Sequence, residues 1–429
     1  MSKKMVKCTI CGAEFEEGTA VCPVCGVGPE NFVPVEPDTE LKKKNTHENF
    51  VIIGGGPAAR SAAAAIRDRN CTCSITLITM EDALPYNRPM LTKSLLKDHS
   101  GDALAIEPAE WYSKNDIYVV TGTKVTAIDT VAREITMEMA DGAKGGMKYD
   151  KLIYAPGAFC FVAPIKGSEL DHVVTVRNVS DTERIRNLVK SRDAKNIVCI
   201  GGGVMGLEGA WNMKEEGFDV TVLETAPALL PRQLDDKAAG LLQRIGEKNG
   251  VNIVTGAKIT EITEDAVLLE DGRAFPAEIV IMSTGMRPYT QLAEESGIRV
   301  DKWVSVDSRM RTSADRVYAA GDCAAVNGQP QAFWAQAEAT GKVAGANAAG
   351  DPMEYEPIGS ALVMHAFGTA VFALGANGKA PDVEYTYEGS LDEEKGTYSG
   401  CYFEDGKMTG AMLVGDISAM PGLVKEIGV

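Results

Sequence analysis

The stretch FVIIGGGPAARSAAAAI (residues 50–66) places four apolar residues before a glycine-rich turn and an alanine-rich segment. This order predicts a buried strand, a tight turn and a helix. Gly54, Gly56 and Ala59 have the spacing Gly-x-Gly-x-x-Ala, in which the glycines let backbone N–H groups approach a pyrophosphate at the positive helix end. Glu81 closes the next strand-like run, SITLITME, where its carboxylate can accept from ribose hydroxyls. The stretch therefore predicts a dinucleotide-binding unit.

A second copy of this pattern lies at NIVCIGGGVMGLEGAWNMK (residues 196–214), with Gly201, Gly203 and Gly206 at the spacing Gly-x-Gly-x-x-Gly. Glu224 ends the following run DVTVLE, and no Arg or Lys stands among the next few residues to meet a 2′-phosphate. We therefore expect NADH rather than NADPH at this unit. A single motif can be a simple tight turn, but two copies, each with its acid, favour one chain that holds two dinucleotides.

Composition describes an ordinary globular chain of 429 residues, with 45% hydrophobic and 24% charged residues. The net charge of −17 argues against nucleic acid as a partner. No apolar run approaches the roughly 20 residues of a membrane span, and MSKKMVKCTICG lacks the apolar core of a signal peptide, so we expect a cytoplasmic protein.

Short apolar runs alternate with helical patterns from residue 50 onward, which predicts an α/β fold with two Rossmann-like units. The tail shows aromatic and β-branched runs separated by glycine turns, which predicts a small α+β domain. The segment PVEPDTELKKKNTHEN is expected to be a solvated linker. We expect these parts: a metal domain at 1–33, the linker at 34–49, a first nucleotide domain at 50–165 that resumes at 286–351, a second nucleotide domain at 166–285, and the α+β domain at 352–429.

Cys8, Cys11, Cys22 and Cys25 form two Cys-x-x-Cys-Gly turns with ten residues between the pairs. Residues 1–33 are too few for a core of their own, so we expect a metal to hold them together. Two such turns bring four sulfurs into a tetrahedron, which suits iron and zinc alike. The spacing leaves the metal open, and a structural zinc ribbon is the alternative to a redox iron.

Residues 50–351 resemble the FAD-dependent pyridine nucleotide oxidoreductases of the glutathione-reductase superfamily. Besides the two fingerprints, the resemblance rests on LPYNRPMLTK (84–93), LIYAPGA (152–158), VIMSTGMRP (280–288) and VYAAGDCA (317–324), and the first of these is similar to NADH:rubredoxin, ferredoxin and nitrite reductases. It implies FAD in the first unit and NAD(P)H in the second. By the same matching it implies these residues: Arg88, Lys93, Gly157, Gly321 and Asp322 beside FAD, Gly285 beside NAD, and Glu208 near the nicotinamide, with Lys93 and Glu208 as candidate catalytic groups. Pro156 departs from the usual Thr, and Trp334 is a candidate to flank the flavin.

The disulfide reductases of this superfamily need a cysteine pair facing the flavin, because a thiolate must attack or leave there. LPYNRPMLTKSLLKD contains no cysteine, and none occurs from residue 206 to 321. The remaining cysteines are expected to be small core or turn residues: Cys71, Cys73, Cys160, Cys199, Cys323 and Cys401. The electrons of a flavin here need another exit.

The segment CPVCGVGPENF (residues 22–32) resembles the short rubredoxin domain of rubrerythrin-type proteins, with Phe32 at the position of a packing aromatic. Met5 and Val6 replace the aromatic that often precedes the first cysteine. A nicotinamide delivers two electrons as hydride and an iron accepts one, and a flavin converts between the two. We therefore expect NADH oxidation by FAD with electron transfer to a rubredoxin-type iron in the same chain.

The resemblance implies a protein acceptor such as a rubredoxin, a flavodiiron protein, a rubrerythrin or a superoxide reductase in an anaerobe, and is compatible with a homodimer. Two alternatives stay open. One is a flavoprotein subunit or redox sensor whose zinc ribbon docks a partner. The other is a diaphorase-like NADH oxidase with structural zinc.

Overall fold

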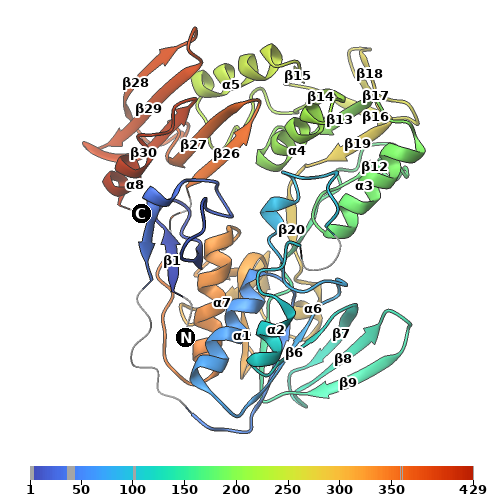
Figure 1. Ribbon diagram of the computed structural model, residues 1–429, viewed down its shortest axis with the longest axis vertical. Coiled ribbons are helices and arrows are strands. Elements are labelled where there is room, and N and C mark those ends of the chain that lie inside the picture. Colours follow the sequence, from blue (N-terminus) through green and yellow to red (C-terminus); the bar gives the residue numbers. More distant parts are fainter. Residues whose placement is uncertain (1–3, 36–43, 100–102, 358, 360, 429) are drawn as a thin grey trace.

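The computed structural model describes residues 4–35, 44–99, 103–357, 359 and 361–428. Two parallel sheets, one for each glycine-rich turn, and an antiparallel C-terminal sheet make up the body of the molecule (Figure 1). The α/β fold expected from the alternating pattern is confirmed. None of the helices in these ranges is long and apolar enough to cross a membrane.

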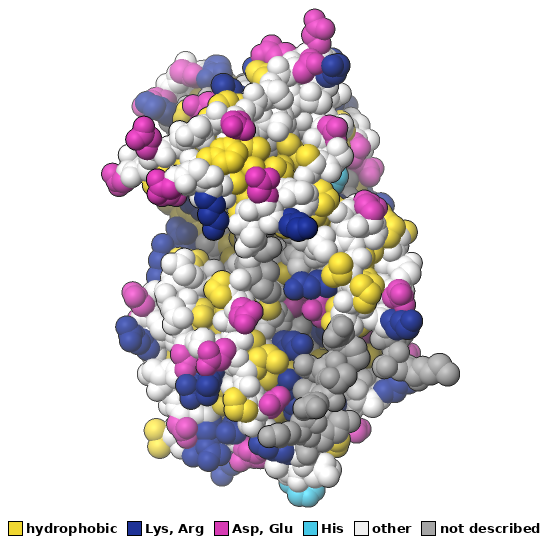
Figure 2. All heavy atoms as spheres, turned by 90° about the vertical axis from the view of Figure 1, so that its left-hand side faces the viewer, with side chains coloured by type: hydrophobic (Ala, Val, Ile, Leu, Met, Phe, Trp, Pro, Cys, Tyr) yellow, Lys and Arg dark blue, Asp and Glu magenta, His cyan; other side chains and the backbone are white. Residues whose placement is uncertain are grey.

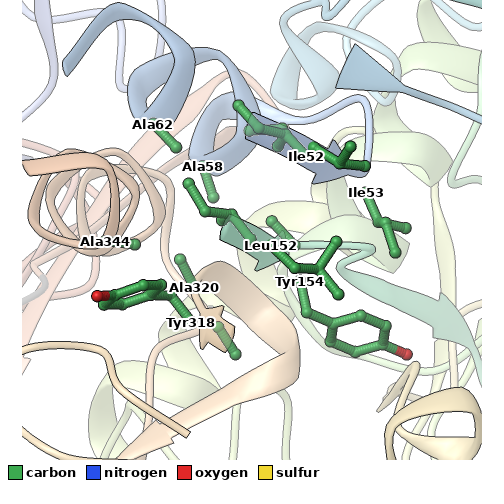
Figure 3. Packing of buried hydrophobic residues seen from close by; sticks show 14 of the residues in the cluster. Ile52, Ile53, Ala58, Ala62, Leu152, Tyr154, Tyr318, Ala320 and Ala344 are labelled. Atoms are coloured by element: carbon green, nitrogen blue, oxygen red, sulfur yellow. The ribbon is translucent and has the colours of Figure 1, made fainter. Parts of the chain in front are cut away.

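The first parallel sheet has the strand order β23-β10-β4-β5-β6. Its strands are β23 (Val317–Ala319), β10 (Lys151–Tyr154), β4 (Asn49–Ile53), β5 (Ser74–Ile78) and β6 (Ile117–Val120). The strand expected from FVII is β4, and the alanine-rich helix is α1 (Pro57–Arg69). One detail differs: β5 ends at Ile78, so Glu81 lies in the loop after the strand rather than at its end. The interior of this unit contains Ile52, Leu152 and Tyr154 (Figure 3).

Helix α1 packs closely against α7 (Trp334–Ala348) because small residues line their contact. Ala58 and Ala62 of α1 lie near Ala344 of α7 in the same buried cluster (Figure 3). A Cβ on Gly341 would lie 2.2 Å from the carbonyl oxygen of Ala58, and one on Gly345 would lie 2.4 Å from that of Ala62. The backbones of the two helices can therefore approach this closely only with glycine at both positions.

The second parallel sheet has the order β12-β19-β13-β14-β15. Its elements are β12 (Val173–Val174), β19 (Ile279–Met282), β13 (Asn196–Ile200), β14 (Asp219–Leu223) and β15 (Asn252–Val254), with helices α3 (Val179–Ser191), α4 (Val204–Glu215) and α5 (Asp236–Lys248). The runs NIVCI and DVTVL are thus β13 and β14, as expected.

Smaller elements complete these two units. They are the sheet β7 (Thr123–Asp129), β8 (Glu134–Met139) and β9 (Lys144–Lys148); the sheet β16 (Ile259–Ile262), β17 (Ala266–Leu269) and β18 (Ala274–Pro276); the sheet β21 (Val300–Asp301), β22 (Trp303–Val306), β24 (Ala324–Val326) and β25 (Gln329–Pro330); the ribbon of β11 (Ala158–Cys160) with β20 (Met286–Pro288); and helices α2 (Ala109–Lys114) and α6 (Gln291–Glu295).

The C-terminal sheet is antiparallel, with the order β26-β27-β30-β29-β28. Its elements are β26 (Leu362–Ala366), β27 (Thr369–Gly375), β28 (Thr386–Asp392), β29 (Thr397–Glu404), β30 (Lys407–Val414) and α8 (Met420–Ile427). Alternate residues of its strands face two different cores. Tyr398 and Met412 join the core of the second nucleotide unit, whereas Phe372 and Leu413 join a core that contains the N-terminal cysteines.

The N-terminal cysteine segment forms a three-stranded sheet of order β2-β1-β3, and we call residues 4–35 the cysteine knot. Its strands are β1 (Met5–Cys8), β2 (Glu14–Glu16) and β3 (Phe32–Pro34). The rings of Phe15 and Phe32 meet edge to face at 4.8 Å, and Val6 is buried. Apolar side chains of α8, β27 and β30 complete the core of the knot, which therefore packs on the C-terminal sheet. In Figure 1, β1 lies between α8 and α7.

The segment expected to be a solvated linker is described only at its two ends, because residues 36–43, with Lys42 and Lys43, lie outside the described ranges. At its far end the chain is anchored rather than free. The backbone N–H of Lys44 donates to Arg69 O at 2.7 Å, and Asn70 Nδ2 donates to Thr46 Oγ1 at 2.6 Å.

Seen from the side in Figure 2, the surface carries charged side chains of both signs and gathers hydrophobic ones in its upper half.

Candidate functional site

A cavity of about 860 Å³ lies where the first nucleotide unit, the second unit and the cysteine knot meet. Its walls come from segments far apart in the sequence. The lining residues that bear on function are Gly54, Gly55, Gly56, Glu81, Arg88, Lys93, Gly157, Gly321, Asp322 and Trp334, together with Val204, Met205 and Glu208 from the second unit and Cys11, Val24 and Cys25 from the knot. The structure thus brings most of the residues expected beside FAD into one cavity.

The first glycine-rich turn is open toward this cavity. Gly54 has φ +134°, and a Cβ there would lie 2.0 Å from the carbonyl oxygen of Ala155, so only glycine fits. Gly56 is the N-cap of α1, and a Cβ there would meet nothing within 4 Å. The N-terminus of α1 therefore faces space that a pyrophosphate fits. Ala59 does not line the cavity but is buried in the core, where its small side chain lets the helix pack on the sheet.

Glu81 and Arg88 form an ion pair at the cavity wall. Tyr86 Oη donates to Glu81 Oε2 at 2.6 Å, and Arg88 Nη1 donates to Asn178 Oδ1 at 2.9 Å. Burial raises the pKa of Tyr86, so its hydroxyl stays a donor. The sequence assigned Glu81 to a ribose and Arg88 to FAD. In the structure Glu81 and Arg88 form an ion pair with each other, and both line the cavity where FAD is expected.

Lys93 and Glu208 meet where the two nucleotide units adjoin. Lys93 Nζ lies 3.0 Å from Glu208 Oε2, and the same oxygen accepts from Thr92 Oγ1 at 2.8 Å. Glu208, on α4, is buried, and both members of the pair line the cavity. Because a charge buried in this way needs a partner, the pair fixes α4 against the loop that follows Arg88.

The second glycine-rich turn repeats the geometry of the first. Gly201 has φ +116°, and Gly203 is the N-cap of α4 with open space beside it. Glu224 Oε2 accepts from the backbone N–H of Gly202 at 2.5 Å, and Oε1 accepts from Ala226 N–H at 2.6 Å. Gly206 lies against the turn, where a Cβ would be 2.1 Å from Gly201 O. The carboxylate of Glu224 is therefore held at the mouth of the turn.

Arg177 is a cavity residue that the sequence reasoning missed. Its Nη2 lies 2.8 Å from Asp322 Oδ2, and its Nε donates to Ala158 O at 3.0 Å. Gly157 stands beside it, since a Cβ there would lie 3.5 Å from Arg177 Nη2. Arg177 follows the apolar run VVTV, whose first two residues form β12, and a cation directly after an apolar run was the available signal. Gly285, with φ +106°, has open space beside its Cα.

The four N-terminal sulfurs have the geometry of a tetrahedral metal site. Cys8 and Cys25 Sγ lie 3.7 Å apart, Cys11 and Cys22 Sγ lie 3.6 Å apart, and all four fall within 4.8 Å of one another. Metal–sulfur bonds of about 2.3 Å in a tetrahedron place the sulfurs about 3.8 Å apart. The donor set therefore fits one iron or zinc ion.

The four-cysteine cluster borders the cavity directly. Cys11 and Cys25, one cysteine from each turn, line it beside Val24, and Asn87 Nδ2 donates to Pro23 O at 3.0 Å. Trp334, at the start of α7, lines the same cavity and packs on the core of the knot. The knot thus packs against the nucleotide units, and two of its four clustered cysteines line the cavity.

The other cysteines provide no redox pair. None of the ten cysteines, all in the described ranges, forms a disulfide. Burial raises the pKa of Cys199 and of Cys323 to about 12, so both remain thiols at neutral pH. Cys73 is buried as well, while Cys71 is exposed. The placements of these four cysteines agree with core and turn roles, whereas Cys160 and Cys401 lie half-buried in β11 and β29.

Two glycine-rich helix N-termini, one carboxylate after each second strand and a cavity bordered by both units are the arrangement of a protein that binds two dinucleotides. The chain belongs to the pyridine nucleotide-disulphide oxidoreductase family, whose model matches residues 48–346. A second model, the rubredoxin NAD+ reductase C-terminal domain, matches residues 361–428. The protein is an NAD(P)H-dependent FAD oxidoreductase.

Several known proteins are similar over most of the chain. The NADH oxidase of Methanocaldococcus jannaschii is 32% identical over 391 residues, which cover 85% of this chain and 87% of the relative. The rubredoxin-NAD(+) reductase of Pseudomonas putida is 35% identical over 64% of this chain and 71% of its own. The crystal structure of NADH:rubredoxin oxidoreductase from Clostridium acetobutylicum superposes with a TM-score of 0.74 and 28% identity, over 89% of this chain and 94% of that one.

Proposed function

We propose that this protein oxidises NADH and delivers the electrons one at a time to a rubredoxin-type iron in its own cysteine knot, and from there to a protein acceptor. One observation carries the proposal: Cys11 and Cys25 line the same cavity as the first glycine-rich turn. A metal held by these sulfurs borders the space that fits FAD. Each NADH oxidised would reduce two one-electron acceptors and release one proton.

Different residues of the cavity would bind different parts of FAD. The N–H groups of the turn at Gly54 and Gly56 would hold the FAD pyrophosphate, with Asp322, Gly157 and Gly321 along the rest of the cofactor. When bound, FAD accepts a hydride and releases electrons singly. Trp334 and Val24 provide apolar surface where the cavity meets the knot.

The second glycine-rich turn would hold the nicotinamide dinucleotide. Gly201 and Gly203 open the N-terminus of α4, and Glu224 stands where a ribose hydroxyl would reach. Thr225 and Ala226 follow Glu224 with no positive charge, which favours NADH over NADPH. Gly285 leaves open space near the strand end, and the Lys93–Glu208 pair would orient the nicotinamide end of the coenzyme.

The acceptor would be a small protein such as a rubredoxin, a flavodiiron protein or a rubrerythrin. Similarity to the rubredoxin reductase of P. putida and to the oxidoreductase of C. acetobutylicum supports this class. With a net charge of −17, long-range attraction would speed encounters with a partner that carries a basic face.

A second candidate function is an NADH oxidase in which zinc merely holds the knot together. The 32% identity to the M. jannaschii NADH oxidase over 85% of the chain favours it, and the sulfur geometry suits zinc equally.

Metal analysis and stopped-flow absorbance together test the proposal. We expect about one iron per chain, with NADH first bleaching the flavin and then the ferric tetrathiolate band. Stoichiometric zinc in protein from iron-replete, zinc-limited cells would refute the redox role. An iron that stays oxidised over many turnovers, while the flavin is fully reduced, would refute it equally.

A further inference from the structure

Glu338 is a half-buried residue with one buried carboxyl oxygen, and it lies where the cysteine knot packs on α7. It lies on α7 one turn after Trp334, and its Oε2 is buried without a hydrogen-bond partner among the described residues. Glu14, in β2 of the knot, lies opposite the Glu338 carboxyl across the contact between the knot and α7. Glu338 does not line the cavity. Its side chain therefore lies at the contact between α7 and the knot and not against the space for the cofactor.

The charges around this carboxyl come from three elements. Arg60 of α1 faces it, but the guanidinium of Arg60 is already committed to an ion pair with Glu107. Glu14 faces it from β2 with a like charge and with its backbone N–H, and the Trp334 indole faces it from the preceding turn of α7. One turn further along α7, Lys342 has an exposed side chain.

Burial raises the pKa of Glu338 to about 8. The charge of Arg60 lowers this pKa and the charge of Glu14 raises it, while hydrogen bonds from the Trp334 side chain and the Glu14 backbone lower it. The ionised form is disfavoured because Oε2 is buried without a hydrogen-bond donor among the described residues and because the acidic Glu14 lies opposite. With the knot removed, the carboxyl would face water.

We propose that Glu338 is a positioning residue whose uncharged carboxyl seats the cysteine knot against the cavity, so that ionisation of this side chain loosens the knot. The inference rests on the proposed function, since a loosened knot matters because it carries the electron outlet. It makes the contact between the two redox centres sensitive to alkaline pH.

Proton linkage gives the direction in which docking of the knot depends on pH. An uncovered carboxyl has its ordinary pKa of 4.5, and the covered one has a pKa of about 8, so the docked state binds the proton more tightly. Docking is therefore strongest at low pH and weakens roughly tenfold per pH unit between these two values. Above pH 8 both states are ionised and no further weakening occurs.

Hydrogen exchange on the full-length protein tests this, with wild type, Glu338→Gln and the exposed control Glu17→Gln compared at each pH from 6 to 9. Comparison at one pH cancels the intrinsic pH dependence of exchange. For peptides covering β2 and the start of α7, the exchange rate of wild type relative to Glu338→Gln should rise about 100-fold between pH 6 and pH 9. Glu17→Gln should match wild type throughout. A ratio that does not change with pH would overturn the inference.

A second variant, Glu14→Gln, tests the same inference if Glu338→Gln folds poorly. Glu14→Gln removes the like charge opposite Glu338, so the wild-type rise with pH should become smaller and end at a lower pH. An unchanged pH profile in Glu14→Gln would contradict the inference as well.

The rate of electron transfer from flavin to iron supplies the functional readout. It should fall between pH 6 and pH 9 in wild type and stay level in Glu338→Gln. Hydrogen exchange does not require iron, so a zinc protein that still shows the pH-dependent exchange would refute the proposed function alone. Electron transfer to iron with a flat exchange profile would refute the role of Glu338 alone.

Discussion

Lys93 Nζ and Glu208 Oε2 lie 3.0 Å apart and join the two nucleotide units across the wall of the shared cavity. The two partners are buried to different degrees: the side chain of Glu208 is 5% exposed, and that of Lys93 is 30% exposed. Removing the lysine leaves a buried carboxylate with Thr92 Oγ1 at 2.8 Å as its hydrogen-bond donor. The ion pair therefore affects both stability and the position of α4.

Lys93→Met should lower the free energy of unfolding by about 2 kcal/mol, below the range for fully buried pairs because the lysine is partly solvated. It should also slow flavin reduction by NADH, since α4 loses its tie to the cavity wall. Urea unfolding and stopped-flow absorbance measure the two effects. Lys97→Met, a nearby exposed lysine, is the matched control and should change neither. Equal stability of Lys93→Met and wild type would show that the pair contributes nothing.

Glu224→Gln should narrow the preference for NADH over NADPH by about tenfold, or ~1.4 kcal/mol. The amide removes the charge that repels a 2′-phosphate, while its oxygen can still accept from Gly202 N–H. Rates of flavin reduction at subsaturating NADH and NADPH give the ratio. Glu215→Gln, on the exposed end of α4, should leave the ratio unchanged. If wild type uses both coenzymes equally well, the interpretation of Glu224 is wrong.

Replacing Cys8 and Cys25 by Ser removes one ligand from each turn, so the metal should be lost. Flavin reduction by NADH should continue, and an artificial acceptor that reaches the flavin should still be reduced. Delivery of electrons to a protein acceptor should fall at least tenfold if iron is the outlet. Cys71→Ser, at an exposed cysteine, should behave as wild type. Undiminished delivery in the double variant would exclude the knot from the electron path.

His172 should make the protein sensitive to acid. It is fully buried, and neither ring nitrogen has a hydrogen-bond partner among the described residues. Burial and then Arg192 lower its pKa from 6.5, and Glu264 only partly opposes them. The unfolded chain therefore takes up a proton that the folded one excludes, and stability falls by up to about 1.4 kcal/mol per unit as pH drops below about 6.5.

Urea midpoints of wild type and His172→Asn from pH 8 to pH 5 check this. The variant should lack this part of the acid dependence, although its stability at pH 8 will be lower from the changed packing. His47→Asn, at an exposed histidine, should keep the wild-type slope. Parallel slopes for wild type and His172→Asn would remove His172 as the cause.

Local patterns predicted the elements that carry the two nucleotide sites. An apolar run, a glycine turn and a small-residue helix follow each other within 17 residues at β4 and α1, so near neighbours in the sequence suffice. The cluster of four thiols in the knot could be predicted equally well from the sequence, because two short turns bring four sulfurs together whatever surrounds them.

Relations between distant segments could not be predicted in this way. Arg177 meets Asp322 across 145 positions, and this contact depends on how the two units pack. The knot was expected beyond a solvated linker, but it shares a core with Phe372 and Leu413 of the C-terminal sheet. The raised pKa of Glu338 depends on that docking and has no local signature.

The glycines of α7 have a consequence for variation in this chain. Because the carbonyls of Ala58 and Ala62 fill the space where a Cβ at Gly341 or Gly345 would lie, alanine at either position would push α1 away from α7. The N-terminus of α1 would move with it, and with it the turn that includes Gly54 and Gly56. Two glycines without a side chain, well outside the turn itself, thus constrain the position of the first glycine-rich turn. A saturation screen for flavin retention should find them as intolerant as the fingerprint glycines.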